Sequence, residues 1–242
     1  MRALLVALCA TAALTTACTG SSPHAAPTPS PTPDAYTDLA PPHSPGVGDF
    51  DQATSQRAYE AVHGLLALTL LDRDTLEGRN TATLLEELSV PNPDLSVAPY
   101  LRTPTRRGLD IRPLLARTVT LREPHVDVVR SSYTADEVQG IAGEQGIRVT
   151  WDGALRYRVT VGGANLELAY VLHVSYVFAP VANEPGGLRL VQVLPGSSHA
   201  ARVVTSCLDK GVLLPTAGSP SSSDFGPGPW PPATGRVAAC PV

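Results

Sequence analysis

The sequence predicts an α+β domain in which N-terminal helices pack on a curved antiparallel sheet of about four to six strands. Two observations carry this prediction. Apolar residues recur at helical spacing early in the chain, whereas from about residue 116 they alternate with polar residues, which is the period of a half-buried strand. With 43% hydrophobic residues in 242 positions, the chain can build one ordinary core and still carry tails.

The first 17 residues have the pattern of a secretory signal peptide. Arg2 is the only charged residue before Cys18, and residues 3–14 are apolar or small. This run is shorter than the roughly 20 residues that a permanent membrane-spanning helix needs, and the small residue Ala17 precedes Cys18. We therefore expect residues 1–17 to be removed and the protein to be exported.

The segment "LTTAC", from Leu14 to Cys18, resembles the lipobox of bacterial lipoprotein precursors, in which a small residue precedes the cysteine that becomes acylated. Thr16 and Ala17 fit this pattern, and Leu14 supplies the aliphatic residue one place further from the cysteine than usual. The resemblance implies a lipid on Cys18 that anchors the protein to the outer face of the cell membrane. The alternative is ordinary secretion with Cys18 left as a free thiol.

Residues 18–49 are expected to form this lipidated cysteine and a disordered tether. Residues 19–49 contain eight prolines among Ser, Thr, Ala and Gly, and they show no apolar periodicity. Such a segment cannot bury enough apolar surface to offset the entropy lost on ordering. The lipid and the tether together would hold a domain clear of a membrane surface.

The folded domain is predicted over residues 50–200, and it starts with helices. In residues 51–78, Asp51 and Thr54 are possible N-terminal caps, and the apolar stripe includes Tyr59, Val62, Leu66 and Leu70. A shorter helix is expected over residues 80–90. Residues 91–113 contain five prolines and no clear period, which indicates an irregular segment.

Strands follow from residue 116 onward. Two strand candidates are separated by Pro124, which indicates an edge position, a bulge or a turn. Two further candidates flank Asp152-Gly153, which has the composition of a two-residue hairpin turn, and Gly162-Gly163 predicts the next turn. The longest strand, "NLELAYVLHVSYVFAP", places every second residue from Leu166 to Phe178 on one apolar face. "GLRLVQVLPG" completes the series.

This order of helices followed by an antiparallel meander resembles the NTF2-like cone fold over roughly residues 50–195. The resemblance rests on element order. Because that family includes enzymes, ligand carriers and interaction modules, it implies a fold and leaves the function open.

Residues 201–242 are predicted to form a Pro, Gly and Ser-rich tail that a disulfide between Cys207 and Cys240 closes. Of the four cysteines, Cys9 leaves with the signal peptide and Cys18 is the predicted lipidation site, so the two that remain can pair in an oxidising compartment. A metal or redox pair is the alternative, although no CxxC motif supports it.

The net charge of the chain indicates which classes of binding partner it can have. The chain has 22 acidic and 18 basic side chains and a formal net charge of −4, which argues against a general nucleic-acid binder. Five arginines between Arg102 and Arg117 form a local basic segment that could meet an anionic lipid or a cell-wall polymer. A solvated loop is the plainer interpretation.

Several residues carry candidate chemistry. "EPHVD" would place Glu123, His125 and Asp127 on one face of a regular strand, as metal ligands or as a solvated charged face. His173 could line a ligand pocket beside Tyr157 or Tyr170, or be satisfied by its neighbours. His63 is expected to pack at a helix boundary, and the run from Ser197 to His199 to lie in a turn.

No sequence motif identifies a reaction, and we predict no cofactor and no metal. The leading hypothesis is a membrane-anchored, non-enzymatic domain that binds an envelope protein or a cell-wall polymer. The alternative is a cone-fold enzyme with a buried acid–base site around His173. A closed apolar core between helices and sheet favours the first hypothesis, and an open cavity with buried titratable groups favours the second.

Overall fold

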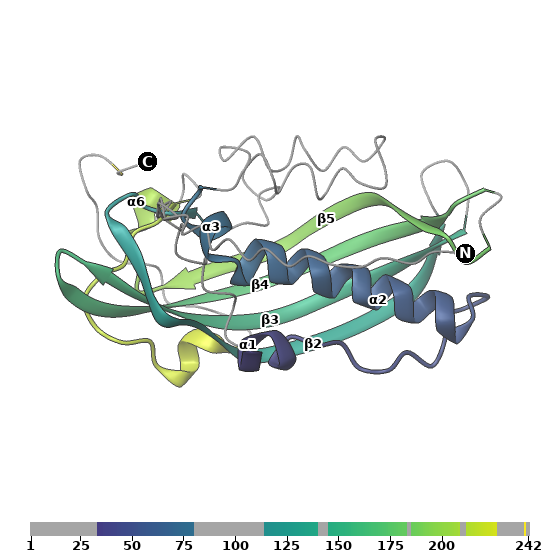
Figure 1. Ribbon diagram of the computed structural model, residues 1–242, viewed down its shortest axis with the longest axis horizontal. Coiled ribbons are helices and arrows are strands. Elements are labelled where there is room, and N and C mark those ends of the chain that lie inside the picture. Colours follow the sequence, from purple (N-terminus) through teal and green to yellow (C-terminus); the bar gives the residue numbers. More distant parts are fainter. Residues whose placement is uncertain are drawn as a thin grey trace, which may run out of the picture.

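The computed structural model describes residues 33–79, 114–139, 145–182, 185–208, 212–226 and 240. They form an α+β fold, as predicted, in which helix α2 (Gln52–Leu66) lies along an antiparallel sheet of order β2-β3-β4-β5 (Figure 1). The strands are β2 (Val119–Gln139), β3 (Gln145–Val161), β4 (Ala164–Pro180) and β5 (Leu188–Ala201). The shorter elements are α1 (Pro33–Asp38), the π-helix η1 (Ala67–Leu71), α3 (Arg73–Leu76), β1 (Leu114–Leu115), α6 (Thr205–Leu208), β6 (Val212–Leu213) and the 3-10 helix η2 (Ser222–Phe225).

The fold begins at α1, before the expected boundary at residue 50. Ala35 and Leu39, four residues apart, are buried in the main core, and the Tyr133 hydroxyl of β2 donates to the Leu39 carbonyl at 2.7 Å. The expectation of a tether over residues 18–49 therefore does not hold for residues 33–49. Two apolar side chains on one helical face give this proline-rich stretch enough burial to become ordered. Residues 18–32 lie outside the described ranges.

Helix α2 starts as the sequence predicts, because the Asp51 carboxylate accepts a hydrogen bond from the Thr54 backbone N–H at 2.7 Å. The helix then changes pitch at η1. There the Thr69 hydroxyl donates to the Leu65 carbonyl at 2.7 Å, and this kind of side-chain bond competes with the regular helical ladder. Asp72 is extended and caps α3 by accepting from the Thr75 N–H.

The main core lies between one face of the sheet and the helices. Every second residue of β4 from Leu168 to Phe178 is buried in it, as predicted. β3 contributes Ile147, Val149, Trp151, Leu155, Tyr157 and Val159 to the same core. On the opposite face, Phe225 of η2 belongs to a small second cluster with Ala154, Ala169, Val171 and Ala201.

β2 is an irregular edge strand. Its pairing with β3 shifts between Leu121 and Val126 and again between Val128 and Arg130, and the Glu123-Pro124 peptide bond is cis. The sequence indicates an edge, a bulge or a turn at Pro124. In the structure, Pro124 lies in one continuous edge strand that contains two bulges, whereas the sequence predicted two separate strands.

The expected hairpin turn at Asp152-Gly153 is wrong. β3 runs straight through this pair, and Gly153 lies opposite Leu172 of β4 and Ser131 of β2. A Cβ on Gly153 would lie 1.9 Å from Cζ2 of Trp151, so the indole occupies the space that a side chain would need. This glycine serves close packing instead of a turn.

The predicted turn at Gly162-Gly163 is confirmed between β3 and β4. Both glycines have positive φ angles, 56° and 83°, as a tight two-residue hairpin requires.

The described residues after the expected boundary at residue 200 pack onto the fold. β5 continues to Ala201, and Val203, Val204 and Cys207 are buried in the main core. β6 pairs in parallel with β1. The predicted helix over residues 80–90 and the irregular segment over residues 91–113 lie outside the described ranges.

Candidate functional site

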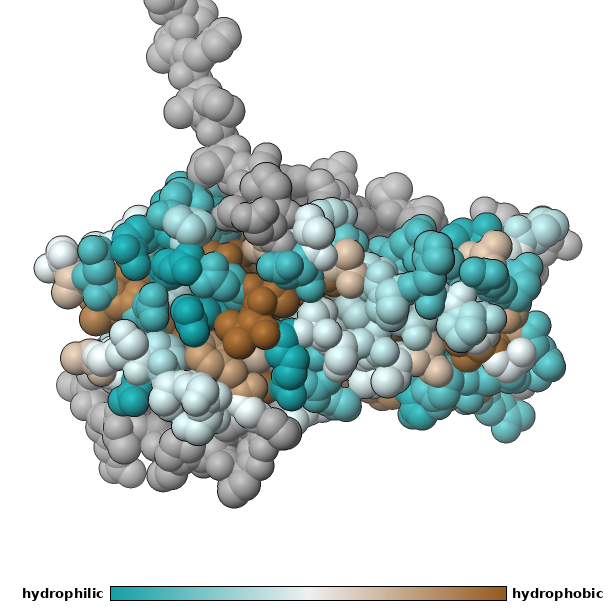
Figure 2. All heavy atoms as spheres, turned by 90° about the horizontal axis from the view of Figure 1, so that it is seen from below, coloured by the Kyte–Doolittle hydropathy of each residue, from teal (hydrophilic) through white to brown (hydrophobic). Residues whose placement is uncertain are grey.

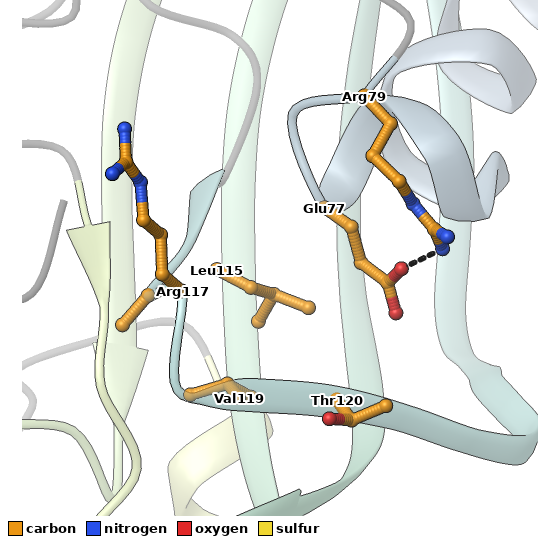
Figure 3. A pocket seen from close by; sticks show the side chains of 7 residues that line it. Glu77, Arg79, Leu115, Arg117, Val119 and Thr120 are labelled. Carbon is orange, nitrogen blue, oxygen red and sulfur yellow. Dashed lines mark hydrogen bonds and ion pairs between the residues drawn. The ribbon is translucent and has the colours of Figure 1, made fainter.

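A pocket of about 260 Å³ lies where the end of α3 meets β1 and the start of β2 (Figure 3). Its described lining combines charged and apolar side chains: Glu77, Arg79, Leu115, Ala116, Arg117, Val119 and Thr120. Arg79 folds onto Glu77, whereas Arg117 points away on the other side (Figure 3). The two guanidinium groups therefore do not converge on one point.

Three donors contact the Glu77 carboxylate of this pocket. It accepts hydrogen bonds from the Leu121 backbone N–H at 3.2 Å and from Arg73 Nε at 3.3 Å, and it forms an ion pair with Arg79. Arg73 also donates to the Leu121 carbonyl at 2.9 Å. The side chains of Arg73 on α3 and of Glu77 directly after it thus pair with the edge of β2 as a neighbouring strand would.

From Arg73 the network continues to a buried histidine. Arg73 donates to Glu123 Oε1 at 3.2 Å, and both Glu123 oxygens lie 3.1–3.2 Å from Nδ1 of His125. His125 Nε2 donates to the Leu71 carbonyl at 2.7 Å. His125 therefore links the end of the π-helix to the bulged edge strand. Its carboxylate partner, Glu123, forms an ion pair with Arg73 of α3.

His125 differs from the sequence-based interpretations of "EPHVD". Its side chain is 0% exposed, so it does not belong to a solvated strand face. Asp127 pairs with Arg158 on β3, whereas Glu123 faces Arg73. The bulge between Leu121 and Val126 breaks the alternation that would have put the three side chains on one face. Among the residues that the structure describes, no group of three His, Cys, Asp or Glu side chains is arranged to hold a metal ion.

The three residues of the predicted pocket are not brought together. Tyr157 and Tyr170 are buried in the main core, and the Tyr157 hydroxyl donates to the Leu70 carbonyl at 2.9 Å. His173 lies on the other face of the sheet, where its side chain is 45% exposed and its Nδ1 lies 3.4 Å from Asp152 Oδ2. The sheet separates the histidine from both tyrosines.

Burial raises the pKa of the core tyrosines, so they are weaker acids than an exposed tyrosine. Desolvation raises the pKa of Tyr157 well above its usual value, with a smaller contribution from Tyr170. Desolvation also raises the pKa of Tyr176 and of Tyr133. These hydroxyls stay neutral at ordinary pH, so they can donate hydrogen bonds but do not serve as general bases.

The other singled-out histidines have structural surroundings. His63 packs against the Tyr36 ring with centroids 4.3 Å apart, and its Nε2 donates to the Tyr36 carbonyl at 3.2 Å, in line with the expected packing role. The run from Ser197 to His199 is not a turn, because it lies in β5. Burial lowers the pKa of His199, and the nearby Asp224 opposes that shift.

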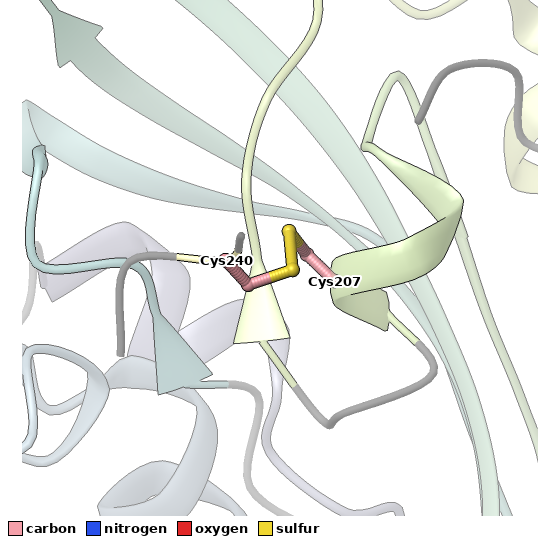
Figure 4. Close-up of a disulfide and its surroundings, with 2 residues drawn as sticks. All are labelled: Cys207 and Cys240. Carbon is pink, nitrogen blue, oxygen red and sulfur yellow. A yellow bond between two sulfur atoms is a disulfide. The ribbon is translucent and has the colours of Figure 1, made fainter. Parts of the chain in front are cut away.

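The disulfide between Cys207 and Cys240 is present (Figure 4). The two Cα atoms lie 5.4 Å apart, within the range of about 4.4–6.8 Å that disulfides span. Cys207 is fully buried on α6, so the bond ties Cys240 to the main core.

Cys18 and the arginines from Arg102 to Arg112 lie outside the described ranges, while Arg117 lines the pocket. In the part of the chain that the structure covers, no helix is both long and apolar enough to cross a membrane.

Comparison with protein-family models finds no match for this chain, and comparison with curated proteins also finds none.

Sequence reasoning missed the network around His125. It identified Glu123 and His125, but Arg73, which donates to Glu123, and the Leu71 carbonyl, which accepts from His125, are 50 and 54 residues away in the sequence. The one usable signal was Pro124 between two strand-like runs, because a bulge can turn a neighbouring side chain inward.

Proposed function

We propose that this protein is an exported lipoprotein whose domain is held at the outer face of the cell membrane by a lipid on Cys18. One observation carries the proposal: the Cys207–Cys240 disulfide uses both cysteines of the folded domain. Cys9 lies in the predicted signal peptide, so Cys18, directly after the lipobox-like residues, is the remaining cysteine. A structural disulfide also suits an oxidising, extracytoplasmic compartment.

We further propose that the domain acts in binding, with an envelope protein or a cell-wall polymer as partner, and has no catalytic role. The burial of Tyr157 and Tyr170 in the main core favours this hypothesis over an enzyme site around His173. The engaged carboxylate of Glu77 in the pocket favours it as well. The position of α2 along the meander supports the resemblance to NTF2-like domains, which include binding modules.

Cell fractionation of cysteine variants tests the anchor. The full-length chain would be expressed in a bacterium that processes lipoproteins, and the membrane and detergent-phase fractions would be compared with the soluble exported fraction. We expect the wild type to partition with membranes and Cys18→Ser to lose this association while keeping its fold. Cys9→Ser is the matched control, because the same chemical change in the signal peptide should leave anchoring intact. Wild-type protein in the soluble exported fraction would contradict the proposal.

A further inference from the structure

Few residues lie between Cys18 and the described part of the fold. That part starts at Pro33 of α1, and the 14 residues 19–32 lie between it and the predicted anchor. Their reach is about 20 Å as a flexible coil and about 43 Å as continuous polyproline II. The 17 residues of β4 alone span about 56 Å. A spacer shorter than the domain restricts which side of the domain can turn away from the membrane.

The side on which the spacer joins the domain is the one formed by α1 and β2, and this connection is firm. The Tyr133 hydroxyl of β2 donates a hydrogen bond to the Leu39 carbonyl just after α1. His63 of α2 packs against the tilted Tyr36 ring and donates a hydrogen bond to the Tyr36 carbonyl. Figure 1 shows α1 beside β2 at the lower edge of the sheet. The entry point of the chain is therefore fixed relative to the edge strand.

Exposed apolar side chains occur on this same side. Among the residues that the structure describes, the large hydrophobic side chains that are strongly exposed are Tyr36, at 44%, and Val129, at 43%. Val129 is the residue at the second β2 bulge, between Val128 and Arg130, and lies about 13 Å along the strand from Tyr133. The view from below in Figure 2 shows hydrophobic atoms gathered on part of this side among hydrophilic ones.

The charges next to Val129 are paired. Arg130 forms an ion pair with Asp152, and Asp127 pairs with Arg158. Paired charges weaken the field that would otherwise favour or oppose approach to a charged surface. Tyrosine is enriched at the membrane–water interface because its ring is apolar and its hydroxyl is polar.

We propose that the α1–β2 edge faces the lipid surface, with Tyr36 and Val129 in contact with the headgroup region. This inference rests on the proposed lipid anchor, which supplies the main membrane attachment. The edge contact orients the domain and leaves the opposite edge, β5, directed away from the membrane.

Spin labels at single introduced cysteines test this orientation. Tyr36→Cys and Val129→Cys would be labelled in the lipidated mature protein, where Cys207 and Cys240 are already joined, and reconstituted in phosphatidylglycerol–phosphatidylethanolamine vesicles. Ser198→Cys, an exposed position on β5, is the matched control. We expect the labels at 36 and 129 to collide several-fold less with a water-soluble nickel chelate than the label at 198. In the unanchored Cys18→Ser background the differences between sites should shrink.

Hydrogen exchange of the unsubstituted lipoprotein gives a second readout that needs no label. Vesicle binding should slow exchange in α1 and around the β2 bulge relative to β5. Equal nickel accessibility at all three sites, with unchanged exchange in α1 and β2, would overturn the proposed orientation while a lipid on Cys18 left the anchor intact. An unmodified Cys18, seen by mass spectrometry of the same sample, would overturn both.

Discussion

His125 on the edge strand and Leu71 at the end of the π-helix are joined by a 2.7 Å hydrogen bond from the imidazole Nε2 to the backbone carbonyl. The histidine is completely buried, and its other nitrogen faces the Glu123 carboxylate. A carboxylate and a carbonyl both accept hydrogen bonds, so both contacts of the imidazole are made to acceptors. The contact fixes where α2 and its π-helical extension end on the sheet.

Replacing this histidine should destabilise the fold. His125→Ala would leave the Leu71 carbonyl without its donor and open a cavity, which should lower the free energy of unfolding by about 2–4 kcal/mol. Urea denaturation followed by circular dichroism measures the change. His43→Ala, at an exposed position, is the control and should change stability by less than about 0.5 kcal/mol. Equal stabilities of the two variants would show that the contact contributes nothing.

The packing of Trp151 over Gly153 gives a second prediction. Gly153→Ala would place a methyl group 1.9 Å from the indole, so the ring must move, and we expect a loss of about 1–3 kcal/mol in stability. Gly64→Ala makes the same change in α2, where no atom lies within 4 Å, and should stabilise by about 0.5–1 kcal/mol. If Gly153→Ala were as well tolerated as Gly64→Ala, the close packing of the Trp151 indole against Gly153 would be contradicted. Denaturant melts of both variants decide this.

The sequence predicted the parts of the fold that follow from local periodicity. Alternation along β4 gave its buried face, and the same parity places Tyr170 and His173 on opposite sides of the sheet. Asp51 was recognised as a helix cap because capping involves residues three apart in the chain.

The remaining features depend on contacts that are distant in the sequence. Gly153 looks like a turn residue until Trp151 is seen to occupy its side-chain space. His125 looks like a surface residue until the β2 bulge turns it toward Leu71. The segment of α1 looks like a tether because its composition is proline-rich, although Ala35 and Leu39 bury a small apolar face. Composition and spacing do not contain this information.

The disulfide should contribute strongly to stability. The cysteines are 33 positions apart, and in the chain-entropy model a loop of this size stabilises by about 4 kcal/mol. Replacing both cysteines, Cys207→Ala with Cys240→Ala, should lower the unfolding midpoint in urea, and the buried Cys207 site adds a packing cost. Thiol labelling of the folded wild type should find both positions blocked. Two reactive thiols there would refute the bond.

Alkaline pH should unfold the protein through its buried tyrosines. Burial raises the pKa of Tyr133, Tyr157 and Tyr176 in the folded state, whereas in the unfolded chain each ionises near about 10. Their contribution to stability is therefore fully present below about pH 10 and is lost as the pH rises above it. The absorbance of the buried tyrosinates should appear together with the loss of circular dichroism. A single smooth titration without unfolding would contradict this burial.

The lipid on Cys18 is the central claim, and mass spectrometry of the N-terminal peptide tests it most directly. The mature wild-type protein would be isolated from the membrane fraction of a lipoprotein-processing bacterium and digested. We predict that its first residue is Cys18 and that this peptide carries the added mass of two or more acyl chains, enough for stable anchoring. An N-terminal peptide that begins at Cys18 or nearby with an unmodified thiol would contradict the account.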